Sequence, residues 1–188
     1  MSNFIIEDFK VDHVDHINSL CQSLLRLGKP SPVQFMPVNL YTLFMEAKGL
    51  VKGDLSLHNV SIEEVLDRDI MVRGDYNQLL QVLLNCLINA IESFDGKGGT
   101  VRCSYHLSDH YWELLIRDYG IGIDYDSRDQ IFEPFFTTKE KRNGLGLTIS
   151  KRIIEDHHGE LLLTSVDDGV EVMIRIPLLN QGEFSGSI

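Results

Sequence analysis

A row of amide side chains lies along one predicted helix of this 188-residue chain. The segment QLLQVLLNCLINAIESF, residues 78–94, is apolar on nearly every side. Within it, Gln81, Asn85 and Asn89 recur every four residues and therefore fall on one stripe of the helix. Amide oxygens suit a hard cation such as Mg²⁺, which prefers oxygen ligands. A core helix with one wet edge would show the same stripe, so both interpretations stay open here.

A carboxylate and two glycines follow an apolar strand in RDYGIGID, residues 117–124. Asp118 ends the strand, where a carboxylate can accept a hydrogen bond from the exocyclic amine of a base. Gly120 and Gly122 would let a flat ring lie against the backbone. By itself, a D-x-G-x-G pattern is also typical of an ordinary turn.

Residues 135–150, FFTTKEKRNGLGLTIS, place a polar and basic stretch in front of a glycine-rich helix start. Free N–H groups at a helix N-terminus attract phosphate, and Gly144 and Gly146 would let an anion approach the backbone. The preceding side chains suit a lid whose basic residues meet phosphates. Core packing of the aromatic residues, a solvated loop and a turn that needs glycine would also explain the same features one by one.

Hydrophobic periodicity predicts the elements that position these groups. Helices are predicted at residues 8–28, from about 39 into the 50s, at 76–94 and at 144–157. Strands are predicted at residues 60–66, 70–73, 100–107, 111–117, 161–165 and 170–176. Residues 118–143 lack periodicity and are long for a connection, which is typical of a functional loop. We therefore expect an α/β two-layer sandwich with a mixed, mainly antiparallel sheet, helices on one face and an additional amphipathic helix at the N-terminus.

Composition narrows the class of protein. The chain has 28 acidic and 17 basic residues, a net charge of −11, which argues against nucleic acid or an anionic membrane as a partner. Its cysteines, Cys21, Cys86 and Cys103, are distant and outside any CxxC, as expected for reduced thiols of a cytoplasmic protein. The longest apolar run is interrupted by amides, so no membrane span is expected, and the first residues lack the apolar core of a signal peptide.

In chain order the motifs read NxxxN, DxGxG, EPFFTTK and GLGL, and this order resembles the ATP-binding catalytic domain of sensor histidine kinases. That domain shares its Bergerat-type fold with gyrase B, Hsp90 and MutL-type ATPases. The resemblance covers about residues 38–178. Together with the Gly- and Pro-containing boundary near residue 30 and the polar last residues, it predicts four parts: an N-terminal helix at 1–30 that is part of a dimerisation hairpin, a linker at 31–37, the ATP-binding domain at 38–179 and a disordered tail at 180–188.

The resemblance implies ATP and Mg²⁺ as cofactors and suggests a role for each matching position. Asn89 resembles the magnesium-binding asparagine and Asn85 its upstream, orienting partner. Asp118 looks like the aspartate that holds the adenine amino group, with Gly120 and Gly122 beside the ring. The lid is expected at Phe135, Phe136, Thr137 and Thr138. The phosphates are expected to meet Lys139, Arg142, Gly144, Leu145, Gly146 and Leu147.

The chain also departs from the family pattern. Arg142 occupies the first glycine position of the usual GxGLGL signature, where it would either clamp a phosphate or stiffen a short lid. The phosphoacceptor motif is absent, because His13 and His16 lie in VDHVDHIN with no following proline. The helix at 8–28 instead resembles the second helix of the dimerisation hairpin, and its apolar stripe would let two copies associate.

The function implied is that of a protein-histidine kinase domain in a two-component system. It would transfer the γ-phosphoryl group of Mg-ATP to a histidine outside this chain. The acceptor hairpin would belong to the same full-length protein, which could be membrane-anchored, or to another protein, and a response regulator would be served indirectly.

Two other functions of the same fold stay open. Clamp-type ATPases of the gyrase or MutL kind carry a glutamate base where this chain has Asn85, and an amide is a poor base. A nucleotide-binding regulatory module is the other alternative, which a pocket blocked by Arg142 would favour.

Overall fold

The computed structural model describes residues 33–68, 70–124, 130–137 and 143–178. The predicted helix at 8–28 with His13 and His16, and the tail expected at 180–188, lie outside the described residues. Association of two copies through that helix therefore stays a prediction. Among the helices of the described part, none has the length and apolar character to cross a lipid bilayer.

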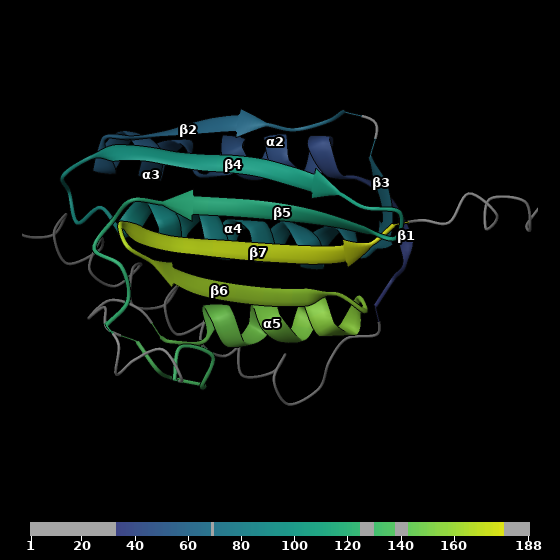
Figure 1. The fold of residues 1–188 in the computed structure, drawn as a ribbon. Helices are drawn as coiled ribbons and strands as arrows, with labels where there is room; N and C mark the ends of the chain where they lie inside the picture. Colours follow the sequence, from purple (N-terminus) through teal and green to yellow (C-terminus); the bar gives the residue numbers. More distant parts are fainter. Residues whose placement is uncertain (1–32, 69, 125–129, 138–142, 179–188) are drawn as a thin grey trace, which may run out of the picture.

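A five-stranded sheet forms the centre of the fold, in the order β2-β4-β5-β7-β6 (Figure 1). Its strands are β2 (Val60–Val65), β4 (Gly99–Leu107), β5 (Tyr111–Asp118), β6 (Glu160–Val166) and β7 (Gly169–Pro177). Only β2 and β4 pair in parallel, and the other three pairings are antiparallel. The predicted mixed, mainly antiparallel sheet is therefore confirmed.

The four helices of the described residues lie on one face of this sheet, which confirms the predicted two-layer arrangement (Figure 1). They are α2 (Leu40–Leu50), α3 (Lys52–His58), α4 (Tyr76–Glu92) and α5 (Gly146–Asp156). Inward-facing residues of β5, Trp112, Leu114 and Ile116, alternate with outward-facing ones and join the core beneath α4. The Cys86 and Cys103 thiols are buried in this core, and burial raises the pKa of each to about 12.

Two details differ from the sequence-based expectation. A short strand, β1 (Met36–Asn39), pairs antiparallel with β3 (Met71–Gly74) in a separate two-stranded sheet. Four residues that include a proline carry too little periodicity to predict a strand. The helix expected from about 39 into the 50s is two helices, because Val51 leaves helical geometry and is buried in the core.

The junction between α4 and α5 is held by a buried histidine. His157 Nδ1 lies 2.7 Å from the Ile153 carbonyl oxygen, and His157 Nε2 accepts the Asp75 N–H at 2.9 Å. Because Nε2 accepts, the neutral ring carries its proton on Nδ1. Burial is the main reason that the pKa of His157 is lowered. The Asp75 carboxylate in turn caps α4 by accepting the Gln78 N–H at 3.1 Å.

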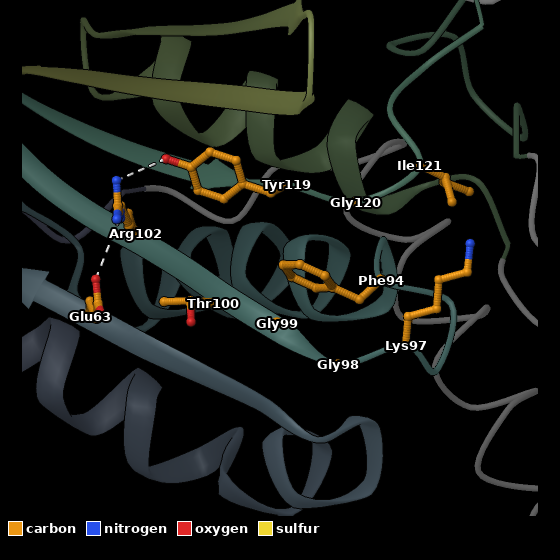
Figure 2. A pocket seen from close by; sticks show the side chains of 10 residues that line it. All are labelled: Glu63, Phe94, Lys97, Gly98, Gly99, Thr100, Arg102, Tyr119, Gly120 and Ile121. Atoms are coloured by element: carbon orange, nitrogen blue, oxygen red, sulfur yellow. Dashed lines mark hydrogen bonds and ion pairs between the residues drawn. The ribbon is translucent and has the colours of Figure 1, made fainter.

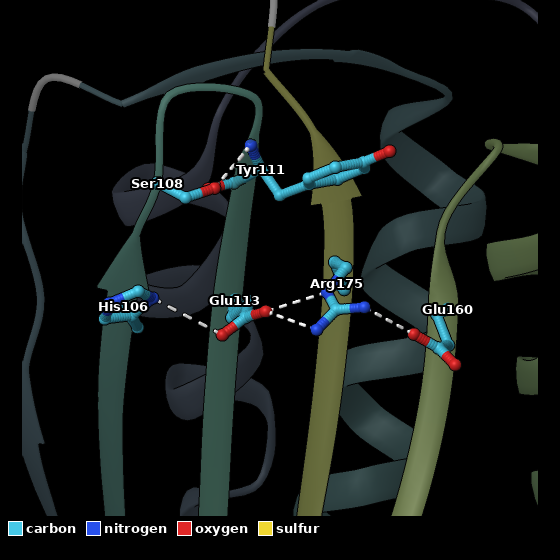
Figure 3. A network of polar contacts seen from close by, with 6 residues as sticks. All are labelled: His106, Ser108, Tyr111, Glu113, Glu160 and Arg175. Carbon is cyan, nitrogen blue, oxygen red and sulfur yellow. Dashed lines mark hydrogen bonds and ion pairs between the residues drawn. The ribbon is translucent and has the colours of Figure 1, made fainter.

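The opposite face of the sheet carries charged side chains, and none of the described helices covers it. Arg175 on β7 donates to Glu113 on β5 and to Glu160 on β6, each at 2.7 Å (Figure 3). His106 on β4 lies 3.5 Å from the same Glu113. These cross-strand pairs give the uncovered face a polar surface.

Candidate nucleotide-binding site

The amide stripe of α4 faces α5, and its members differ in their partners. Asn85 Nδ2 donates to the Gly146 carbonyl at 3.2 Å and to Ser150 Oγ at 3.0 Å. Gln81 Oε1 is buried without a hydrogen-bond partner in the described part of the chain. Asn89 is half-buried, and its side-chain amide makes no hydrogen bond to any described residue. Asn85 therefore holds the two helices together, whereas the Asn89 amide is available to a ligand.

Asp118 ends β5 as a buried carboxylate, only 4% exposed. Its Oδ1 accepts the Gly120 N–H at 3.0 Å. Burial raises the pKa of Asp118, and hydrogen bonds from Gly120, Ser93 and Val170 and the charge of Arg117 oppose that rise. A buried acceptor held in place by the backbone can select a ligand that offers a matching donor.

The loop after Asp118 runs across the C-terminal end of α4. The Ile121 N–H donates to the Ser93 carbonyl at 2.9 Å. A Cβ at Gly120 would lie 2.1 Å from Ser93 Oγ, so the contact requires glycine. Gly122 has a φ of +73°, a conformation that glycine adopts without strain. The loop thus brings Asp118 and the α4 stripe to one site.

The N-terminus of α5 opens toward the same region. The helix begins at Gly146, two residues later than the periodicity predicted, and no side chain caps it. Its first N–H groups have no intrahelical acceptor, so they can bind an anion. Leu145, beside them, is buried and packs in the core rather than toward a ligand.

Gly144 has a structural reason to be glycine in addition to the predicted contact with phosphate. Its φ is +64°, and a Cβ there would lie 2.4 Å from the carbonyl carbon of Phe135. The Phe135 N–H also donates to the Gly144 carbonyl at 3.0 Å. This close pairing joins the first lid residue to the start of α5.

The expected lid is described only in part. Phe135 is 60% exposed with a φ of +69°, Phe136 is half-buried and Thr137 is exposed. Thr138, Lys139 and Arg142 lie outside the described residues.

Two contributors were not predicted from the sequence. Ser150 accepts from Asn85, and Thr148 Oγ1 donates to the Phe132 carbonyl at 3.0 Å, which ties α5 to the segment before the lid. Ser150 lies one turn after Gly146 on the buried side of α5, and this spacing could have indicated its role. No sequence signal indicates the contact of Thr148.

Comparison with known proteins agrees with this geometry. Residues 74–180 match the family model described as histidine kinase-, DNA gyrase B- and HSP90-like ATPase. The signal transduction histidine-protein kinase AtoS of Escherichia coli K12 is 35% identical over 171 residues, 90% of this chain and 28% of AtoS. The chain thus spans less than a third of the length of that relative.

Two solved structures share the fold. The catalytic domain of histidine kinase ThkA is 31% identical with a TM-score of 0.70, covering 77% of this chain and 96% of that one. ThkA in complex with the response regulator TrrA is 27% identical with a TM-score of 0.74, covering 90% of this chain and 49% of that one. The chain therefore belongs to the histidine kinase-, DNA gyrase B- and HSP90-like ATPase family, as an ATP-binding catalytic domain of the histidine kinase kind.

Proposed function

We propose that this domain transfers the γ-phosphoryl group of Mg-ATP to a histidine that lies outside this chain. The observation that carries the proposal is the position of Asn85. Its amide nitrogen donates to two acceptors on α5, at 3.2 and 3.0 Å. An amide used in this way cannot take a proton from water, so the site lacks the base that hydrolysis would need there.

Asp118 is the proposed adenine contact. Its buried carboxylate can accept a hydrogen bond from the exocyclic amine, which distinguishes adenine from a base with an oxygen at that position. Gly120 and Gly122 keep side chains away from the ring. The Gly120 N–H holds the carboxylate in one orientation, so the acceptor is placed before the nucleotide arrives.

The N-terminus of α5 is the proposed phosphate contact, and Asn89 is the proposed Mg²⁺ ligand. The uncapped N–H groups of α5 suit the phosphate oxygens, and the unpartnered Asn89 amide offers an oxygen to a hard cation. The metal, when bound, would neutralise charge on the phosphates. We also assign Lys139 and Arg142 to the phosphates and residues 135–138 to the lid. Positioning and electrostatics would supply most of the catalysis, as is general for phosphoryl transfer.

The partners follow from the same proposal. An acceptor-histidine hairpin, in the same full-length protein or in another, would present its neutral imidazole to the γ-phosphate. Since ThkA has been solved with a response regulator, we propose that such a regulator receives the phosphoryl group after the histidine. We retain the proposed division of the chain, with a partial hairpin at 1–30, a linker at 31–37, the ATP-binding domain at 38–179 and a tail at 180–188.

Incubation with γ-labelled ATP tests the proposed function. The chain is assayed alone and with a separate protein that carries the acceptor hairpin of AtoS. We expect no self-labelling, slow ATP hydrolysis, and an acid-labile, base-stable label on the hairpin protein. A variant of the hairpin protein with its acceptor histidine changed to glutamine is the matched control and should stay unlabelled.

Three outcomes would contradict the proposal. Fast ATP turnover without an acceptor would favour a clamp-type ATPase. Self-labelling that disappears in His13→Ala or His16→Ala would place the acceptor in this chain. Nucleotide binding without any transfer to either the AtoS hairpin or the hairpin of the full-length protein would favour a regulatory module.

A further inference from the structure

A cavity opens beside the loop that follows β5, on the sheet face that no described helix covers (Figure 2). We call it the sheet basin. It has a volume of about 590 Å³, within the usual range for a small-molecule site. Figure 2 shows Lys97 and Ile121 at one end, Arg102 and Tyr119 at the other, and Phe94 between them. Of the residues proposed to contact the nucleotide, only Gly120 also lines the basin.

The charge around the sheet basin is opposite to that of the whole chain. The chain carries 28 acidic and 17 basic residues, yet the basin is lined by two cations and one acid. That acid, Glu63, lies 3.4 Å from Arg102, so it is already paired. The Lys97 residue is exposed, and its ammonium group makes no hydrogen bond or ion pair with the described part of the chain.

A third cation adds to this local excess. Arg117 lies directly opposite Arg102 in the β4–β5 register, an arrangement of like charges that is normally unfavourable. Both guanidinium groups lie over the Tyr119 ring, at 5.1 Å for Arg117 and 5.6 Å for Arg102. Arg117 Nε is buried without a hydrogen-bond partner among the described residues. An anion nearby would relieve this repulsion.

The basin also offers apolar surface beside Lys97. Phe94 lines the basin but is only 5% exposed, because its ring packs in the core and against Gly99, where a Cβ would lie 2.2 Å from the ring. Ile121 lines the same end of the basin as Lys97, and 69% of its surface is exposed (Figure 2). An apolar group could cover Ile121 and reach the exposed edge of Phe94 while its charged end meets the lysine.

We propose that the sheet basin binds a small aromatic carboxylate. Its ring packs against Ile121 and the exposed edge of Phe94, and its carboxylate pairs with the ammonium group of Lys97. Arg102, which is engaged by Glu63 and donates to the Tyr119 hydroxyl at 3.3 Å, contributes its charge at longer range. Substitution of Lys97 should therefore weaken binding more than substitution of Arg102.

A ¹H–¹⁵N NMR titration of the full chain with sodium 2-naphthoate tests this site. We expect saturable shifts of the backbone amides of residues 97–100 and 120–121. In Lys97→Gln the affinity should fall about tenfold, the value of one charge-assisted hydrogen bond. Ile121→Ser should also weaken binding, by about threefold or more from the lost apolar contact. 2-Naphthamide, the same ring without the charge, should bind the unchanged chain about tenfold more weakly.

Two controls separate this site from general charge effects and from the nucleotide site. Arg68, outside the basin, also lies over an aromatic ring, 5.2 Å from the Tyr41 centroid. Arg68→Gln removes one positive charge there and should leave naphthoate affinity within about twofold. Saturating Mg-ADP should not displace naphthoate. Shifts confined to residues 144–149 and abolished by ADP, shifts that do not saturate, or full affinity in Lys97→Gln would each overturn the proposal.

Discussion

Replacing Asp118 by asparagine tests the proposed adenine contact most directly. The side chain is 4% exposed, and its Oδ1 accepts the Gly120 N–H at 3.0 Å. Asparagine keeps the shape but exchanges one acceptor oxygen for a donor NH₂ group. If the nitrogen faces the ligand, two donors meet. If it faces Gly120, the clash moves to the backbone N–H. Either orientation leaves one donor unmatched.

The expected loss of affinity follows from that unmatched contact. A hydrogen bond to a charged group contributes about 1.5–3 kcal/mol, and an unsatisfied buried donor costs about 1–3 kcal/mol. Allowing for overlap between the two effects, we expect ATP binding to weaken by about 2–3 kcal/mol, or about 30- to 150-fold.

The raised pKa of Asp118 predicts that Asp118→Asn weakens ATP binding without lowering the stability of the folded chain. Burial raises the pKa of Asp118 above its ordinary value of 3.8, so the folded chain holds this proton more tightly than the unfolded chain does. The contribution of Asp118 to the free energy of unfolding is therefore fully present below the ordinary pKa of 3.8, and it declines as pH rises through the raised pKa of the folded chain. Neutral asparagine avoids the cost of burying a charge, so Asp118→Asn should not unfold more easily at neutral pH.

The assay is a titration with a fluorescent ATP analogue, with and without Mg²⁺, alongside a thermal melt. Asp109→Asn makes the same change at an exposed turn beyond the opposite end of β5, and it should leave affinity within about twofold. Unchanged affinity in folded Asp118→Asn would refute the adenine assignment. Weak binding together with a lower melting temperature would refute the reasoning about its pKa.

Four other substitutions test the remaining parts of the site. Asn89→Ala should remove most of the Mg²⁺ dependence of ADP binding, measured by calorimetry, and a full response to Mg²⁺ would contradict the assignment. Asn85→Asp cannot donate to the Gly146 carbonyl, 3.2 Å away, so urea unfolding should show a loss of about 1–2 kcal/mol, and an unchanged midpoint would argue against the bridge. Gly144→Ala forces a φ of +64° on alanine and should cost about 1–3 kcal/mol by the same measurement. The pKa of His157 lies below its ordinary value of 6.5, so stability should fall as pH drops from about 7.5 to about 5.5, and His157→Gln should flatten that dependence.

Apart from β1 and the division between α2 and α3, the order of the described helices and strands and the position of the motifs could be predicted from the sequence. Strand alternation around Leu114 and the buried helix of residues 78–94 are local patterns, and each repeats within a few residues. Asp118 and the glycines after it occupy adjacent positions at the end of such a strand. The fold class and the candidate nucleotide site therefore follow from short-range information, and the fold class is confirmed.

Contacts between residues that are far apart in the sequence could be identified only from the tertiary structure. Asn85 meets Ser150 across 65 positions, and this pairing turns a predicted orienting residue into a bridge between helices. Gly144 is required by its contact with the Phe135 backbone as well as by any bound phosphate. The sheet basin brings Lys97 beside Ile121, 24 positions later in the chain. Periodicity shows which face of an element is buried, but it carries no information about the partner against which that face packs.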